Sequence, residues 1–161
     1  MALSGAFDVN ENSRMDDIDP TRILVGVDGS DSSIDALLRG ARIAKALDAP
    51  LVVVTTWQLS TDLGAFYPPS GWSPEENARE IATTAIARAF PEAKPSKLSA
   101  VTLEGPAARV LIEQSDRASM LVLGNRGHGG FLGLLLGSVS AACAAHAHCP
   151  VLIMHSATTP A

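Results

Sequence analysis

The stretch that decides the fold runs Met120-Leu121-Val122-Leu123-Gly124-Asn125-Arg126-Gly127-His128-Gly129-Gly130 and leads, after an apolar run, to Gly137-Ser138-Val139-Ser140. Its apolar start predicts a buried strand, and the Ala-rich sequence at its end predicts a helix. Glycines let the main chain approach a phosphate without a Cβ in the way. The first N–H groups of a helix lack partners, and its dipole favours an anion there. The stretch therefore predicts an anion site, with a plain glycine-rich surface loop as the alternative.

Composition indicates one domain and argues against nucleic acid as a partner. The chain has 161 residues, 47% hydrophobic but only 4% aromatic, so Ala, Val, Leu and Ile must build its core. Its formal net charge of -5 disfavours binding that works by phosphate neutralisation. Residues 1–20 are acidic and lack the basic start and apolar run of a secretory signal. We expect a flexible tail at 1–20, a single domain at 21–156 and a short tail at 157–161, with a partner-docking arm as the alternative for the first segment.

The cysteines and the uncharged C-terminal segment 127–161 suggest neither a metal site nor a membrane span. Cys143 and Cys149 are expected to be reduced thiols in a cytoplasmic protein, because no secretory signal precedes them. His146 and His148 lie near them, but residues two apart on a helix do not face each other, so a structural role is favoured over metal binding. Residues 131–145 are uncharged but shorter than the ~20 apolar residues that a membrane span needs. We predict no transmembrane segment and no metal ligand.

Apolar runs alternate with helix-length segments along the chain. Strands are predicted at 22–27, 51–57, 98–103, 120–123 and 150–154. Helices are predicted after the capping residues 28–31 with Ile34, Leu37, Leu38, Ala41 and Ile43 at helical spacing, from Ser73-Pro74 to about Phe90, after Glu104-Gly105-Pro106, and from Ser138 onward. This alternation favours a parallel sheet with helices on both faces. The Gly- and Pro-rich segment 59–71 is expected to be irregular, as a site of specificity or a packed lid.

Ligands bind such sheets at the carboxyl ends of the strands, where the strand order reverses. The loops at that edge are Gly26-Val27-Asp28, Thr55-Thr56-Trp57 and the glycine loop that follows Leu123. If the first and fourth strands are neighbours, the three loops converge, which favours a nucleotide over a bare phosphate. Asp28 has two open roles, ligand contact and capping of the following helix. Arg126, the permanent cation of the glycine loop, is interpreted as a phosphate partner rather than a solvated side chain.

These motifs resemble one known family. The spacing from Gly124-x-x-Gly127 to Gly137-Ser138 is similar to the ATP-binding signature of universal stress proteins. The opening residues 23–30, the turn at 104–106 and the closing residues 149–153 resemble that family too, so the resemblance covers about residues 22–154. It implies a doubly wound sheet of five parallel strands in the order 3-2-1-4-5, with helices on both faces and a homodimer formed through the last strand.

The resemblance also implies a ligand, ATP with Mg²⁺, and a role for each part of the site. Asp28 would meet the adenine or ribose beside main-chain groups of Val27 and Thr56, and the glycine loop would lie along the ribose and phosphates. At the start of the last helix, main-chain N–H and hydroxyl donors to the phosphates would come from Gly137, Ser138, Val139 and Ser140. The expected binding residues are Gly26, Val27, Asp28, Thr56, Leu123, Gly124, Arg126, Gly127, Gly137, Ser138, Val139 and Ser140.

Binding without fast turnover is the favoured interpretation of function. The Walker pattern is absent, and the glycine loop contains no lysine. We expect a nucleotide-dependent regulatory module of the stress response that acts on an unknown protein partner, and we predict no catalytic residue. The alternatives are a slow ATPase or nucleotidyl-transfer enzyme, and a dimeric interaction protein with a vestigial pocket. A nicotinamide oxidoreductase is a further rival, since Gly127-x-Gly129 is a fragment of a dinucleotide fingerprint, although it follows the fourth strand rather than the first.

Overall fold

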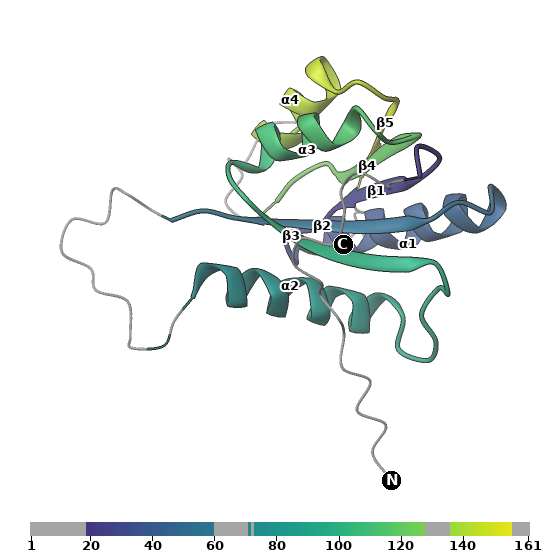
Figure 1. Ribbon diagram of the computed structural model, residues 1–161, viewed down its shortest axis with the longest axis horizontal. Coiled ribbons are helices and arrows are strands. Elements are labelled where there is room, and N and C mark those ends of the chain that lie inside the picture. The colour runs from purple at the N-terminus through teal and green to yellow at the C-terminus, as the bar shows by residue number, and fades with distance from the viewer. Residues whose placement is uncertain (1–18, 60–70, 72, 128–135, 156–161) are drawn as a thin grey trace, which may run out of the picture.

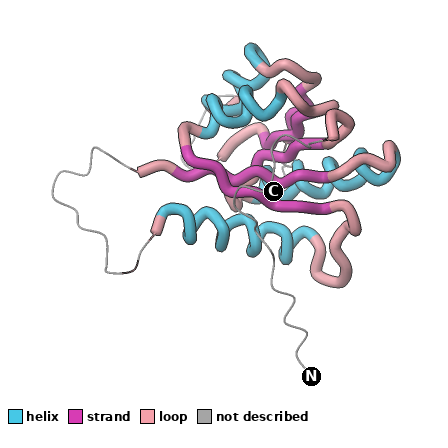
Figure 2. Tube along the Cα trace, in the orientation of Figure 1, coloured by secondary structure: helices cyan, strands magenta, loops and turns pink. Residues whose placement is uncertain are grey.

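The structure is a computed structural model that describes residues 19–59, 71, 73–127 and 136–155. Strands and helices alternate along the chain (Figures 1 and 2) as β1 (Ile23–Gly26), α1 (Asp31–Ala46), β2 (Leu51–Trp57), α2 (Pro74–Ala89), β3 (Leu98–Glu104), α3 (Ala107–Ser115), β4 (Met120–Gly124), α4 (Ser138–His146) and β5 (Val151–Met154). All five strands are parallel and pair in the order β3-β2-β1-β4-β5. The predicted fold class and strand order are confirmed.

The sheet lies between two layers of helices. Helices α1 and α2 cover one face, and α3 and α4 cover the other (Figure 1). The alternation of side chains along β1 shows how both faces are filled, since Ile23 and Val25 pack with α1 and α2 while Leu24 packs with α3 and α4. All three side chains are fully buried. A central parallel strand that is covered on both faces must be apolar throughout, which is why the first strand could be recognised in the sequence.

Helix α1 is capped by Ser30 and not by Asp28. The Ser30 hydroxyl accepts a hydrogen bond from the N–H of Ser33. Asp28 lies two residues before Ser30, and its Oδ1 accepts hydrogen bonds from Ser30 N at 3.0 Å and from Ser30 Oγ at 2.6 Å. The capping role considered for Asp28 is therefore indirect, because its carboxylate orients the residue that caps. Helix α2 begins as predicted, with Ser73 as the cap and Pro74 as its first residue.

Element ends differ from the predictions by one residue at several places. Arg22 and Val27 lie outside β1, and Pro150, which has no N–H to pair, lies outside β5 although its carbonyl accepts from Leu121. β3 and β4 each extend one residue further, to Glu104 and Gly124, and α2 ends before Phe90. Leu38, predicted on the apolar face of the first helix, is 37% exposed at the border of that face.

Three expectations fall wholly or largely outside the described residues, and one of them, the short tail at 157–161, lies wholly outside. The segment predicted as irregular is described only at Leu59 and Gly71, and the acidic tail only at its last two residues. Within the parts of the chain that the structure describes, no helix is long and apolar enough to cross a membrane.

Candidate functional site

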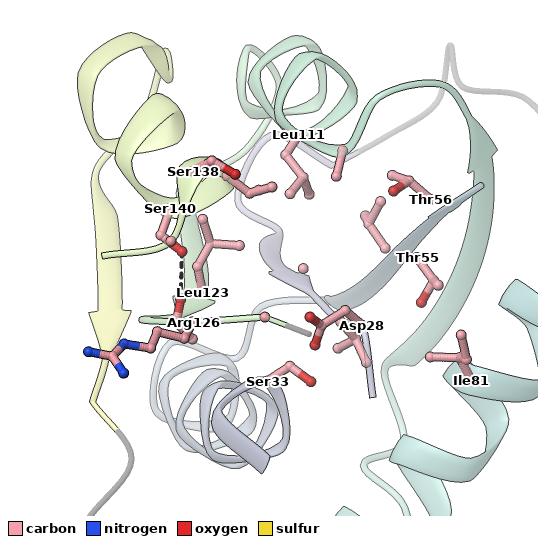
Figure 3. A pocket seen from close by; sticks show the side chains of 18 residues that line it. Asp28, Ser33, Thr55, Thr56, Ile81, Leu111, Leu123, Arg126, Ser138 and Ser140 are labelled. Carbon is pink, nitrogen blue, oxygen red and sulfur yellow. Dashed lines mark hydrogen bonds between the residues drawn. The ribbon is translucent and has the colours of Figure 1, made fainter. Parts of the chain in front are cut away.

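A cavity of about 320 Å³ opens at the carboxyl ends of β1, β2 and β4 (Figure 3). It lies where the strand order reverses, because β1 pairs with both β2 and β4. Helix α1 follows β1 on one face and α4 follows β4 on the other, so the two connections diverge and leave a crevice between them. The expected convergence of the three loops therefore occurs.

All twelve residues singled out from the sequence line this cavity. Thr55, which lies in one of the three loops expected at this edge, also lines the cavity. The structure adds others that the sequence did not indicate, namely Ser33, Val54, Ile81, Ala107 and Leu111. Ile81 comes from α2 and Leu111 from α3, so both helix layers contribute to the walls (Figure 3). Motif spacing around the glycine loop carries no information about which turns of these more distant helices reach the crevice.

The start of α4 presents main-chain donors to the cavity, but with one correction. Gly137 was expected to supply its N–H to a ligand, and this N–H instead donates to the Asn125 carbonyl at 2.7 Å. The first bond inside the helix is from Ala141 N to the Gly137 carbonyl. Among the residues that the structure describes, the N–H groups of Ser138, Val139 and Ser140 have no acceptor. Three successive amides at the positive end of a helix dipole remain as donors.

The hydroxyl of Ser140 is a second correction. It was expected to donate to a ligand, and it donates to the Gly124 carbonyl at 2.7 Å (Figure 3). Gly137 is the cap residue of α4 and provides no side-chain hydrogen bond, whereas α1 and α2 are capped by serine hydroxyls. An anion in the cavity would therefore meet the N–H groups of α4 without competition from a capping side chain.

Protein donors hold the three successive carbonyls of residues 124–126. Gly124 O accepts from the hydroxyl of Ser140, Asn125 O from the N–H of Gly137, and Arg126 O from the hydroxyl of Ser32. Ser32 is buried and comes from the first turn of α1. No local pattern identified it, because the contact joins residues that are far apart in the sequence. These bonds direct carbonyl oxygens into the protein and away from the place where an anion would sit.

Gly124 is required by packing at the end of β4. A Cβ at this position would lie 2.4 Å from the Ser32 Oγ and 2.7 Å from the Ser32 main-chain carbon. Contacts this short force the backbone to move, so the glycine lets β4 pack directly against the start of α1. At Gly127 a Cβ would meet the Oδ2 of Asp28 at 2.3 Å, which shows that the glycine loop and the Asp28 carboxylate lie in close contact.

The two charged residues of the cavity lie differently. The Asp28 carboxylate faces the cavity, with Thr56 and Ile81 on the side away from Ser138 (Figure 3). The Arg126 side chain extends toward β5 and away from Asp28, so the main chain of this arginine, rather than its guanidinium, borders the cavity (Figure 3). Buried Val27, Val54 and Leu123 supply an apolar lining between these groups.

The described residues contain no group of three or more His, Cys, Asp or Glu side chains placed to hold a metal ion. Cys143 is buried and Cys149 half-buried, and both are free thiols. Burial, with a smaller contribution from Cys149, raises the pKa of Cys143 to about 11, and burial also raises the pKa of Cys149. Both sulfurs are therefore protonated near neutral pH and are weak metal ligands there.

Fold and cavity together define a doubly wound α/β protein in which a helix start without a side-chain cap lies at the topological switch point. The chain matches the universal stress protein family over residues 20–155 and belongs to that family.

Individual relatives agree with this assignment. The chain is 34% identical over 143 residues to universal stress protein Rv2005c of Mycobacterium tuberculosis, covering 83% of this chain and 48% of the relative. The chain thus spans about half the length of the curated relatives it matches. A solved universal stress protein in complex with cAMP is 29% identical, with a TM-score of 0.60 and coverage of 85% of this chain and 98% of that one. Protein Rv1636 of M. tuberculosis is 33% identical, with a TM-score of 0.51 and coverage of 84% and 95%.

Proposed function

We propose that the cavity binds an adenine nucleotide and that ATP, as its Mg²⁺ complex, is the ligand. The observation that carries this proposal is the set of N–H groups at Ser138, Val139 and Ser140, which have no acceptor among the described residues and border the cavity. The cAMP complex of a family member that is 29% identical supports an adenine nucleotide as the class of ligand.

In the proposed complex the phosphates lie against the start of α4 and the base lies beyond Asp28. The helix amides would hold phosphate oxygens through charge-assisted hydrogen bonds. The Asp28 carboxylate can accept from ribose hydroxyls, because it faces the cavity. The apolar lining from Val27, Val54 and Leu111 suits the faces of a base. Mg²⁺ would be held by the phosphates, and we assign it no protein ligand.

One position allows the role of a single amide to be tested. Ser138 is the first residue of α4, where proline is tolerated, and Gly137 before it has φ -69° and ψ 161°, a conformation that suits a residue preceding proline. Ser138→Pro removes the N–H and the hydroxyl, whereas Ser138→Ala removes the hydroxyl alone. The difference in ATP affinity between these two variants isolates the contribution of the amide.

We expect calorimetry to show saturable ATP binding to the wild-type chain. Ser138→Pro should bind about tenfold more weakly than Ser138→Ala, as expected for loss of a hydrogen bond to a charged group worth about 1.5 kcal/mol. No binding by the wild type at millimolar ATP, with or without Mg²⁺, would refute the proposal. Equal affinities of the two variants would show that the Ser138 N–H does not bind a phosphate.

We further propose that nucleotide occupancy regulates a protein partner and that the chain forms a homodimer through β5. This strand pairs only with β4, so its other edge is open among the described residues, and all four of its residues are half-buried. An open strand edge is a ready surface for pairing with a second copy. Analytical ultracentrifugation with and without ATP tests the proposed homodimer, and a monomer in both conditions would contradict it.

A further inference from the structure

A second hollow, of about 490 Å³, lies at the amino ends of β2 and β3, opposite the cavity at the carboxyl ends of the strands. It is bounded by the C-terminal half of α1 and by the segment that joins α2 to β3. Its lining includes Leu51, the first residue of β2, and Lys97, which directly precedes β3. We call this hollow the basic groove.

The basic groove has an apolar floor and a positively charged rim. Ala44, Ala49 and Leu51 are buried in its floor, and Phe90 adds an aromatic ring. The rim carries Arg42, Lys45, Lys94 and Lys97 against a single carboxylate, Asp48. The three lysines on the rim are all the lysines of the 161-residue chain. Such concentration of one charge over an apolar floor suits an acidic segment with apolar side chains.

Part of this positive charge lacks a carboxylate partner. Lys97 is paired with Asp48, with 2.7 Å from Nζ to Oδ1. Arg42 and Lys45 are exposed, one turn apart on α1, and form no ion pair within the described part of the chain. Two cations at the edge of an apolar floor are therefore available to an acidic partner.

The chain itself contains a segment of this chemistry. Residues 7–17 carry Asp8, Glu11, Asp16 and Asp17 against one arginine, with Phe7 and Val9 as apolar side chains. This segment lies outside the described residues, which begin at Asp19.

The described chain begins next to the groove. The Asp19 carbonyl accepts a hydrogen bond from the N–H of Arg22 in a turn that precedes β1. This turn lies at the amino ends of the strands, as Lys97 does. The pKa of Asp19 is lowered, chiefly by hydrogen bonds from Thr21 and to a lesser degree by the charge of Lys97, which agrees with this proximity.

We propose that residues 7–17 dock in the basic groove of the same chain, with their carboxylates on the rim and Phe7 and Val9 on the floor. Up to ~3.5 Å per extended residue lets the twelve-residue span from Phe7 to Asp19 reach about 40 Å. The short tether keeps the segment at an effective concentration in the millimolar range, so weak contacts suffice to populate the docked state.

A zero-length carbodiimide cross-linker tests this docking in the full-length protein, because it joins carboxylates directly to lysines. Every lysine lies on the rim, so the carboxylate partners identified by mass spectrometry are those that visit the groove. The Asp48–Lys97 pair serves as an internal positive control. We expect additional cross-links from Asp8, Glu11, Asp16 or Asp17, and we expect 1 M salt, which screens beyond about 3 Å, to suppress them.

Two charge reversals in α1 form the matched comparison. Arg42→Glu reverses a charge on the rim, and Arg39→Glu reverses an exposed charge of the same helix that does not line the groove. Neither variant removes a lysine, so the cross-linking chemistry stays the same. We expect Arg42→Glu to lower the yield of tail cross-links by about threefold and Arg39→Glu to leave it unchanged.

Three results would overturn the docking proposal. The first is formation of the Asp48–Lys97 cross-link with no cross-link from residues 7–17. The second is equal loss of tail cross-links in both α1 variants. The third is tail cross-links that join isotopically light and heavy chains in a mixed sample, which would place the segment on a second copy. None of these results depends on nucleotide binding.

Discussion

Replacing Ser32 by alanine removes the hydrogen bond that the first turn of α1 donates to the carbonyl of Arg126. The Ser30 hydroxyl also approaches this carbonyl, but at 3.5 Å it is a weak substitute. A half-buried carbonyl that loses its donor costs about 1–3 kcal/mol if nothing replaces it. Because Arg126 is half-buried, water can restore part of the loss, and we expect the free energy of unfolding to fall by about 1 kcal/mol.

The larger consequence of Ser32→Ala concerns the nucleotide proposal. Without the serine, the Arg126 carbonyl can turn toward the cavity and place its oxygen near the phosphates. We expect ATP affinity to fall by about fivefold to tenfold, or about 1 to 1.4 kcal/mol. Urea denaturation measures the free energy of unfolding, and calorimetry with ATP on separate portions of the same preparation measures the affinity.

Ser115→Ala is the matched control for Ser32→Ala. Ser115 is also a buried serine, and its hydroxyl donates to Ile112 O and accepts from His148 N, far from the cavity. We expect it to lower stability by a similar amount without changing ATP affinity. If Ser32→Ala binds ATP as tightly as the wild type, or if both variants lose affinity in proportion to stability, the role given to Ser32 is wrong.

Three further predictions concern packing, pH and a buried charge. Gly124→Ala should lower the free energy of unfolding by about 1–3 kcal/mol, because its Cβ would press on Ser32, whereas Gly137→Ala, whose Cβ meets nothing closer than 3.5 Å, should cost less in the same urea titration. The pKa of Cys143 is raised from 9.0 to about 11 in the folded chain, so the unfolded chain loses this proton first as the pH rises. The free energy of unfolding should therefore fall by about 2 kcal/mol between pH 9 and pH 11, and Cys143→Ala should remove this part of the pH dependence. Arg22 is buried, and its guanidinium donates a hydrogen bond to Gln114 Oε1 at 3.1 Å. In thermal denaturation, Gln114→Ala should therefore lower the free energy of unfolding by about 1.5–3 kcal/mol, and Gln114→Glu, which places a negative charge beside the arginine, should raise it. The same response from both variants would exclude a charge effect.

The order of elements was predictable because each strand is short, apolar and bounded by residues with strong local preferences. Ser73 and Pro74 mark a helix start wherever they occur in this order, and the structure begins α2 there. The 3-2-1-4-5 strand order came from the resemblance to a family, since apolar runs contain no information about which strands become neighbours. Once β1 and β4 are neighbours, the loops that follow them must meet at one edge.

The details that could not be predicted depend on contacts between distant residues. The helix rule correctly indicates free amides at the start of α4, but only the fold brings the Asn125 carbonyl to the Gly137 N–H. The hydroxyl of Ser140 could equally have faced a ligand, and it is the position of Gly124 that decides its direction. Ser32 reaches the Arg126 carbonyl from α1, and Ile81 reaches the cavity from α2. Nothing in their immediate sequence distinguishes these two residues from other helical residues.

The pairing of β1 with β4 also has a consequence for biosynthesis. It joins Ile23 to Met120, so the centre of the sheet cannot close until most of the chain has left the ribosome. Until then β1 exposes an apolar edge that aggregation could exploit, and chaperones would be expected to engage nascent chains that end before β4. The cavity at this pair needs both strands and the start of α4, so a small molecule that binds it stabilises only chains in which β1 and β4 have already paired.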